Sequence, residues 1–283
     1  MKPIVSVLLP TYNRPIWLKE ALESLLIQDV PIELVILNNG SNDAYTSCII
    51  HDYAHKFAGF IHIHSDTNSF KNMESMLRNA TCDYVVNFCD DDRMLPGNLR
   101  DKIKMLEMSP LAAFAFSPAE SIDKEGLRDG KLIGCHSKLA MSFDDMLPTS
   151  IPVMSSVVMR REALSIPISH IDSMYGEWTQ YLEVLNDGWI AAYTDKPMTE
   201  LRVHEMSETV QRGRIGRKSL DSHFNVWKHW VEERGIKPKP ETWRKMLEVF
   251  NGNALDLYGQ SGEYLDEMRK FISFMVDNGG ELG

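Results

Sequence analysis

The chain has 283 residues, a formal net charge of −10 at pH 7 and a hydrophobic share of 43%. This length suits one large α/β domain or a domain with an appendage, and the composition excludes a disordered or fibrous protein. The negative net charge argues against a general nucleic-acid binder, because such proteins need an excess of Lys and Arg to neutralise phosphates.

Strand-like and helix-like segments alternate over the first hundred residues. A β-branched apolar run at residues 4–9 suits a strand buried on both faces, and the apolar residues of 15–27 recur at helical spacing. Further strands are predicted at 32–37, 60–64 and 84–89, with helices ending near residue 55 and covering 70–79. We therefore expect an α/β fold with a mostly parallel sheet flanked by helices.

Polar loops follow three of these strands, at Thr11–Arg14, Asn38–Asp43 and Asp90–Asp92. In such sheets the ligand lies beyond the carboxyl ends of the strands. We therefore expect the three loops to form one site, built from segments that are distant in sequence.

The second half of the chain has a less regular pattern. Strands are predicted at 112–116 and 189–193, and 153–159 is a further apolar run. A helix is predicted at 178–185, and helices follow from residue 220 with a break at 235–240. Aromatic residues of the tail, including Trp227, Trp230 and Trp243, recur at helical spacing, which favours a core stripe over a membrane-bound or dimer-forming face. We divide the chain into a catalytic domain, 1–215, and a helical C-terminal extension, 216–283.

No apolar run approaches the roughly 18–20 residues that span a bilayer, and the first residues lead into a strand rather than a signal peptide. These features predict a soluble, cytoplasmic protein. The four cysteines form no CxxC pair, so neither a disulfide framework nor a zinc site is expected. Cys48, Cys82 and Cys89 lie in apolar or mixed stretches, which favours their burial.

Three consecutive aspartates, Asp90–Asp92, follow the strand at 84–89. Because neighbouring carboxylates repel one another, a bound cation readily explains their concentration at a strand end. Mn²⁺ or Mg²⁺ suits such oxygen ligands and could bridge a diphosphate. A solvated acidic turn or a helix N-cap is the structural alternative.

The motifs, taken in order along the chain, resemble those of the family 2 glycosyltransferases, which have the GT-A fold. The resemblance covers roughly residues 4–210 and is carried by Val7–Arg14, Leu34–Asp43, Asn68, Asn72, Asp83–Val85, Phe88–Pro96, Gly176–Trp178 and Arg202–His204. Each motif is weak alone, whereas the ordered set is specific.

The resemblance implies a nucleotide pocket and a metal site. The nucleotide-binding residues would be Pro10, Thr11, Tyr12, Arg14, Asn38, Asn68, Asn72 and Asp90. Asn38 departs from the acidic residue that the family usually has there, which leaves the nucleotide preference open. Asp91 and Asp92 are the expected metal ligands. His204 would reach the metal or the diphosphate, with a structural role as the alternative.

The resemblance also implies a general base for inversion by direct displacement. Glu177 is the candidate, although Gly176 replaces the first acid of the family's acidic pair. A Glu favoured at a helix N-terminus by the macrodipole is the alternative. Asp172 and Glu183 are the fallback bases. A phosphate clamp in a closing loop, or else a solvated face, is predicted for the basic run Arg212, Arg214, Arg217 and Lys218.

These features together predict a metal-dependent, inverting glycosyltransferase. It would move a sugar from a UDP- or dTDP-sugar to a saccharide acceptor in bacterial surface polysaccharide synthesis. A lipid-linked acceptor would bring the protein to the inner face of the membrane. The sequence does not decide whether the protein forms a homo-oligomer.

Two alternative functions remain. One is a catalytically silent saccharide- or nucleotide-binding protein, which the departures at Asn38 and Gly176 keep open. The other is a sugar-1-phosphate nucleotidyltransferase, which is disfavoured because residues 9–14 contain no glycine for a phosphate loop.

Overall fold

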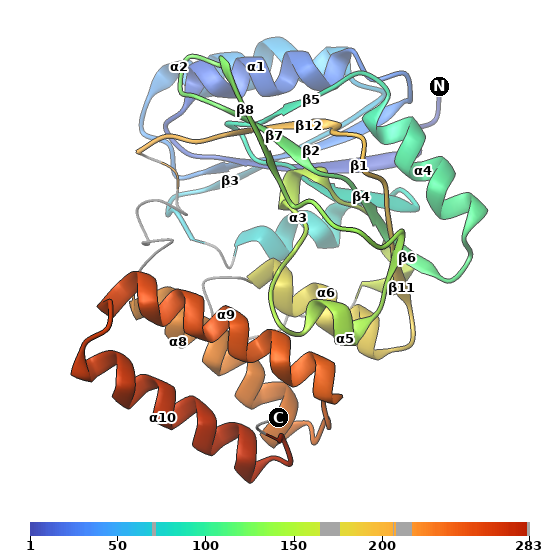
Figure 1. Cartoon of the computed structure of the whole chain (residues 1–283). Coiled ribbons are helices and arrows are strands. Elements are labelled where there is room, and N and C mark those ends of the chain that lie inside the picture. The colour runs from blue at the N-terminus through green and yellow to red at the C-terminus, as the bar shows by residue number, and fades with distance from the viewer. Residues whose placement is uncertain (70–71, 165–175, 206, 208–216, 282–283) are drawn as a thin grey trace. The chain divides into compact units, whose positions relative to one another are not determined.

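The computed structural model describes residues 1–69, 72–164, 176–205, 207 and 217–281 (Figure 1). The chain forms two compact units that are interleaved in sequence. The first unit comprises Met1–Ala140, Ile151–Pro167 and Trp189–Val203, and the second comprises Met141–Ser150, Ile168–Gly188 and His204–Gly283. The division of the chain between residues 215 and 216 into folding domains stays a prediction.

The main sheet of the described residues has eight strands in the order β3-β2-β1-β4-β10-β6-β11-β9. In that order they cover Gly59–Ser65, Ile32–Asn39, Val5–Thr11, Tyr84–Asn87, Val158–Arg160, Ala112–Phe116, Ile190–Tyr193 and Ala140–Met141. The pairs β1–β2, β2–β3, β1–β4 and β6–β11 are parallel, whereas β10 runs antiparallel to both of its neighbours. The predicted, mostly parallel sheet is confirmed.

Apolar side chains on both faces of the central strands explain why helices cover both sides of this sheet. Val5, Val7 and Leu9 of β1 pack into a cluster with side chains from helices α1, α2 and α4, whereas Leu8 points into a separate cluster with α3. Figure 1 shows α1 and α2 on one face and α3 on the other. These helices cover Pro15–Leu26 (α1), Ala44–Tyr53 (α2), Met73–Asn79 (α3) and Asn98–Met108 (α4).

The helix boundaries follow local signals in the sequence. Pro15 is the first residue of α1, where a missing backbone N–H costs nothing. Asp43 caps α2, because its Oδ1 accepts a hydrogen bond from the Thr46 N–H at 2.7 Å. The helix predicted at 70–79 is described from Met73 onward, and residues 70 and 71 lie outside the described residues.

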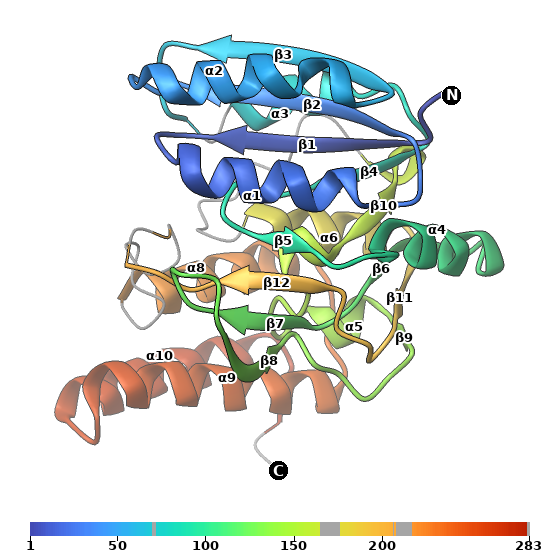
Figure 2. The same ribbon diagram turned by 90° about the horizontal axis from the view of Figure 1, so that it is seen from above.

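A second sheet lies beside the first in the same unit, in the order β5-β12-β7-β8 (Figure 2). Its strands cover Arg93–Met94 (β5), Thr199–Arg202 (β12), Ala119–Ile122 (β7) and Arg128–Ile133 (β8). The sequence analysis missed this sheet, because β5 has two residues and β8 is polar and almost fully exposed. β12 pairs antiparallel with β5, and Glu200 lies opposite Arg93.

The N-terminal end of α4 is tied to β12 by a buried polar chain. Asn98 Nδ2 donates to the Met198 carbonyl at 2.5 Å and to Thr199 Oγ1 at 3.0 Å. Lys102 Nζ donates to Asn98 Oδ1 at 2.8 Å, and the Lys102 side chain has no exposed surface. A charged group is therefore buried in the segment that positions β12.

Helices dominate the second unit. They cover Phe143–Met146 (α5), Gly176–Asn186 (α6), Arg217–Lys228 (α8), Pro240–Tyr258 (α9) and Gly262–Asp277 (α10), and residues 229–233 extend α8 as a π-helical turn. Trp227 is fully buried, its Nε1 donates to the Leu147 carbonyl at 2.9 Å, and its ring lies 5.4 Å from that of Phe271. Trp230 and Trp243 are also buried, which confirms the core stripe.

One local prediction needs correction. Cys48 is exposed on α2, where its neighbour Ile50 takes the buried position, whereas Cys82 is buried as predicted. The apolar run at 153–159 forms a 3₁₀ turn at Met154–Ser156 and leads into β10. In the part of the chain that the structure describes, no helix combines the length and apolarity needed to cross a bilayer.

Replacement of Lys102 by Met is expected to stabilise the protein. Burial lowers the pKa of Lys102 from 10.5 to about 7, so between these values the unfolded chain binds a proton that the folded chain lacks. Stability therefore rises as the pH increases from about 7 towards 10. We expect Lys102→Met to raise the free energy of unfolding at pH 7 by about 1–3 kcal/mol and to flatten this rise, measured by urea unfolding.

The control for this measurement is Lys104→Met, which changes an exposed lysine of the same helix. It should leave both the stability and its pH dependence unchanged. A loss of stability at pH 7 in Lys102→Met would contradict the argument from burial.

Candidate functional site

The carboxyl ends of β1, β2 and β4 bring the three predicted loops together. Thr11 lies opposite Asn38 in the register of β1 and β2, and Thr11 Oγ1 donates to Asp90 Oδ2 at 2.8 Å. The Asn13 N–H donates to Ser41 Oγ at 3.0 Å. All three polar loops therefore meet at one edge of the main sheet.

The first loop holds Asp90 from one side. The Tyr12 N–H donates to Asp90 Oδ2 at 3.3 Å, and Arg14 Nη1 donates to Asp90 Oδ1 at 3.1 Å and to Asp91 Oδ2 at 2.9 Å. Asn13 adopts a φ of 52°, a conformation that Asn tolerates better than most residues. The left-handed turn thus aims the Arg14 guanidinium at two carboxylates.

The end of β2 is bound to the loop that precedes α3. Asn39 Nδ2 donates to Asn68 Oδ1 at 2.8 Å, and Asn72 Nδ2 donates to Asn39 Oδ1 at 2.6 Å. Gly40 has a φ of 89°, and a Cβ there would lie 2.9 Å from the Asn68 backbone N. The sequence analysis named Asn68 and Asn72 but missed Asn39, which joins them. The Asn-Asn-Gly at the strand end was the available signal.

Asn38, the next-to-last residue of β2, is buried. Its Oδ1 accepts the Ser41 N–H at 3.0 Å and closes the turn after β2. Among the other predicted pocket residues, Thr11 is buried, Pro10 is partly exposed and Tyr12 is 41% exposed at the sheet edge. The nucleotide-binding roles of these residues stay predictions.

Asp92 is held by donors that the sequence analysis did not pair with it. Its Oδ1 accepts the Arg202 backbone N–H at 2.9 Å, and its Oδ2 accepts Ser155 Oγ at 2.5 Å. Ser155 Oγ in turn accepts the Cys89 N–H at 3.1 Å. Asp92 is 1% exposed. The triplet is therefore fixed from β12 and from the turn before β10.

The pKa values of Asp90 and Asp92 are both raised. Burial, followed by the charge of Asp91, raises the pKa of Asp92 to about 8 and that of Asp90 to about 6. Arg14 and Thr11 oppose the rise at Asp90. Buried, mutually repelling carboxylates favour the uptake of a positive charge, and a divalent cation would supply it.

The donor set of the triplet fits such a cation. Among the described residues, Cys89, Asp91 and Asp92 offer ligand atoms that all lie within 4.8 Å of one another. Two carboxylates suit Mg²⁺ or Mn²⁺, which prefer oxygen ligands. Burial raises the pKa of the Cys89 thiol well above its usual value, so the carboxylates are the better ligands. The sequence analysis did not foresee Cys89 in this group.

Glu177 and His204 both belong to the second unit. Glu177 is the second residue of α6 and is partly exposed, whereas His204 is buried two residues beyond β12. The fallback base Glu183 forms an ion pair with Arg234 at 3.2 Å. The catalytic role of Glu177 and the metal-binding role of His204 stay predictions.

The predicted basic run is described only in part. Asp172, Arg212 and Arg214 lie outside the described residues. Arg217 forms ion pairs within the second unit, with Asp221 at 3.0 Å and Glu267 at 2.7 Å. Lys218 is exposed.

Known proteins resemble this chain in sequence. The family model described as Glycosyl transferase family 2 matches residues 6–165. TuaG of Bacillus subtilis (strain 168), named as a teichuronic acid biosynthesis glycosyltransferase, is 24% identical over 223 residues, which are 77% of this chain and 86% of TuaG.

Solved structures resemble it in fold. TarS of S. aureus in complex with UDP-GlcNAc superposes with a TM-score of 0.59 at 16% identity, covering 100% of this chain and 93% of that chain. A mannosyltransferase from Pyrobaculum calidifontis in complex with GDP-Man and Mn²⁺ has a TM-score of 0.63 at 16% identity, covering 99% and 77%. At this identity the likeness shows a shared fold, in agreement with the predicted GT-A architecture.

Asp92→Asn is expected to weaken Mn²⁺ binding by more than roughly 100-fold, because the amide loses the ligand charge. The same amide can still accept the Arg202 N–H and bond to Ser155, so the variant should fold. Ser155→Ala should weaken binding by about 10-fold, because the carboxylate loses its orienting donor. Free Mn²⁺ measured by electron paramagnetic resonance gives both affinities.

The exposed Asp83 provides the matched control. Asp83 precedes β4, whereas the triplet follows it, so Asp83→Asn removes one carboxylate outside the triplet. Its Mn²⁺ affinity should equal that of the natural chain. Equal affinities in Asp92→Asn and Asp83→Asn would rule out a metal site at the triplet.

Proposed function

The chain belongs to glycosyl transferase family 2, and we propose that it transfers a sugar from a nucleoside-diphosphate sugar to a saccharide acceptor, with inversion and with a divalent cation. One observation carries this proposal. A group of ligand atoms from Cys89, Asp91 and Asp92 lies at the carboxyl edge of a parallel sheet, where α/β proteins bind nucleotides.

The proposed donor is a UDP- or dTDP-sugar. The nucleotide would lie against Thr11 and Tyr12 at the ends of β1 and β2, where the exposed Tyr12 ring offers a flat apolar surface. Asn38 can both donate and accept hydrogen bonds, which suits more than one base. The UDP-GlcNAc bound by TarS and the GDP-Man bound by the mannosyltransferase support a nucleotide-sugar donor.

Asp91 and Asp92 would hold the cation, and His204 is proposed as a further ligand. When bound, Mn²⁺ or Mg²⁺ neutralises the negative charge that develops on the leaving diphosphate. The Arg14 guanidinium, which contacts two carboxylates of the triplet, adds positive charge at the same place. Asp90, bound by Thr11 and Arg14, would face the ribose or the donor sugar.

Glu177 is the proposed general base. It would take the proton from the acceptor hydroxyl as that oxygen bonds to the anomeric carbon. The bond from the anomeric carbon to the diphosphate oxygen breaks in the same step, and its electron pair leaves with the diphosphate. Glu183, which forms an ion pair with Arg234, is the fallback base. Positioning and electrostatics would supply most of the catalysis.

The proposed acceptor is a growing bacterial surface polysaccharide or its lipid-linked precursor. The similarity to TuaG, a protein named for teichuronic acid biosynthesis, supports this class of acceptor. A cytoplasmic location, contact with the inner face of the membrane and a homo-oligomer stay predictions. A nucleotidyltransferase remains disfavoured, because the first loop has no glycine to cradle phosphates and the family model matches more than half of the chain.

The experiment that tests the proposal incubates the protein with UDP-, dTDP- and GDP-sugars and Mn²⁺, with and without oligosaccharide acceptors. Release of nucleoside diphosphate that depends on both Mn²⁺ and acceptor is the expected result. Release of pyrophosphate from a sugar phosphate and a nucleoside triphosphate would instead indicate a nucleotidyltransferase. Donor binding without turnover for every acceptor would favour the silent binding protein, to which Asn38 and Gly176 point.

Glu177→Gln is expected to lower kcat by roughly 10²–10⁴-fold, because the amide cannot take a proton in the transition state. The KM for the donor should change by less than about threefold, since the nucleotide is held at the other loops. Steady-state kinetics with the active donor and acceptor give both values.

Glu183→Gln, on the same helix, is the matched control and should retain most of kcat. An undiminished kcat in Glu177→Gln would exclude Glu177 as the base. A loss in Glu183→Gln alone would transfer the role to that residue.

A further inference from the structure

We propose that Arg202 is a positioning residue, which holds Asp91 and Asp92 in the geometry that binds the cation. The inference rests on the proposed function, since it concerns the same metal site. Arg202 lies at the end of β12, and the pairing of Glu200 with Arg93 places it alongside the triplet. It is 110 residues away from Asp92 in sequence.

Arg202 contacts the triplet with both its backbone and its side chain. Its backbone N–H donates to Asp92 Oδ1 at 2.9 Å, and its Nε donates to the Asp91 carbonyl at 2.8 Å. The first bond orients a carboxylate, and the second fixes the peptide between the two expected metal ligands. A shift of β12 would therefore move both ligands together.

The rest of the guanidinium points into the protein. Nη1 donates to the carbonyls of Asp123 and Lys124, at 3.2 and 3.0 Å, and Nη2 donates to Glu20 Oε2 at 2.5 Å. The side chain has no exposed surface. Each of its three nitrogens thus has a partner within the protein, so Arg202 acts through the triplet and not on the substrate.

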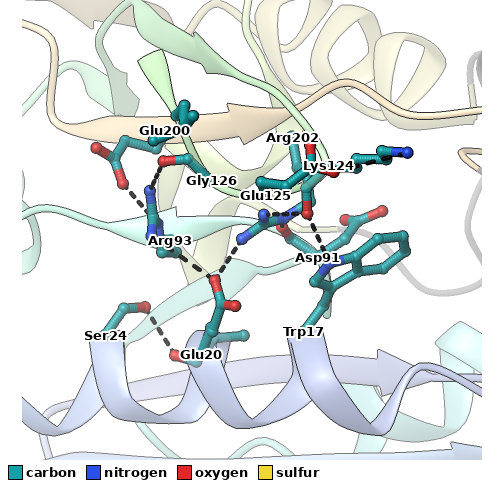
Figure 3. A network of polar contacts seen from close by, with 12 residues as sticks. Trp17, Glu20, Ser24, Asp91, Arg93, Lys124, Glu125, Gly126, Glu200 and Arg202 are labelled. Atoms are coloured by element: carbon teal, nitrogen blue, oxygen red, sulfur yellow. Dashed lines mark hydrogen bonds and ion pairs between the residues drawn. The ribbon is translucent and has the colours of Figure 1, made fainter.

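A second arginine extends the same network (Figure 3). Arg93 follows the triplet directly, and its Nε donates to Glu200 Oε2 at 2.7 Å while its Nη2 donates to the Gly126 carbonyl at 2.8 Å. Its Nη1 lies 3.7 Å from Glu20 Oε2, the oxygen that Arg202 also binds. The turn at 123–126 and the helix α1 are thereby tied to the backbone of the triplet.

Trp17 closes the network on the α1 side. Its ring lies 5.7 Å from the Arg202 guanidinium, and its Nε1 donates to the Lys124 carbonyl at 3.2 Å. The carbonyl of Lys124 therefore receives donors from two elements. This arrangement requires a planar guanidinium, because a lysine ammonium has one nitrogen and cannot reach Asp91, the 123–124 carbonyls and Glu20 at once.

The test compares Arg202→Met and Arg202→Lys with the natural chain, by titration with Mn²⁺ alone followed by electron paramagnetic resonance. We expect both variants to bind Mn²⁺ roughly 10- to 100-fold more weakly, which is the usual effect of removing a partner that orients metal ligands. The lysine variant keeps the positive charge. Weak Mn²⁺ binding by this variant would therefore show that the several N–H donors of the planar guanidinium, and not its charge, position the metal ligands. If Arg202→Met does not fold, Arg202→Lys alone tests the inference.

Arg160→Met is the matched control, because the Arg160 guanidinium likewise donates to two backbone carbonyls of the same unit, those of Ala112 and Leu106, and these lie outside the network around the triplet. It should lower the melting temperature but change the Mn²⁺ affinity by less than about twofold. The inference is overturned if the Arg202 variants lose only thermal stability, as Arg160→Met does, and bind Mn²⁺ like the natural chain.

The failure of the proposed function has a different signature. If the natural chain itself does not bind Mn²⁺, metal-dependent transfer at the triplet is contradicted, and the inference fails with it. If the natural chain binds Mn²⁺ and the Arg202 variants bind it equally well, the positioning role alone is wrong.

Discussion

The burial of three adjacent carboxylates is the constraint on which the rest of the site depends. Asp90–Asp92 are each less than a tenth exposed, and moving carboxylates out of water costs several kcal/mol per charge unless partners compensate. The protein supplies donors from three distant segments, through Thr11 and Arg14 of the first loop on one side and Ser155 and Arg202 on the other. A divalent cation would provide the positive charge that these donors do not.

The triplet lies where the two sheets of the first unit meet. β4, in the main sheet, ends just before it, and β5, in the second sheet, begins just after it. The geometry of the acidic residues therefore depends on how β12 pairs with β5 and on the arginines that link both to α1. This dependence explains why a second sheet of short strands matters to a site that otherwise belongs to a parallel α/β fold.

Local signals predicted much of the first unit. Residues 15–27 have the spacing of an amphipathic helix, and α1 begins at the predicted proline. The apolar runs that became β1 and β2 need no distant partner to be recognised as buried strands. The second sheet lacked such signals, since β5 is too short for a pattern and β8 begins with four polar or glycine residues and is almost fully exposed. The same limit explains the error at Cys48, because an apolar neighbourhood does not tell which side of a helix faces the core.

The sequence by itself determined the order of strands and helices from β1 to β4, the three polar loops at one sheet edge and the family, because hydrophobic periodicity and strand-end motifs are properties of short segments. Only the tertiary structure decided which groups hold the acids. Ser155 and Arg202 are 63 and 110 residues from Asp92 in sequence. No local pattern around either residue predicts its hydrogen bond to Asp92. Such partners depend on which strands pair and in which register, and packing across the whole unit sets that choice.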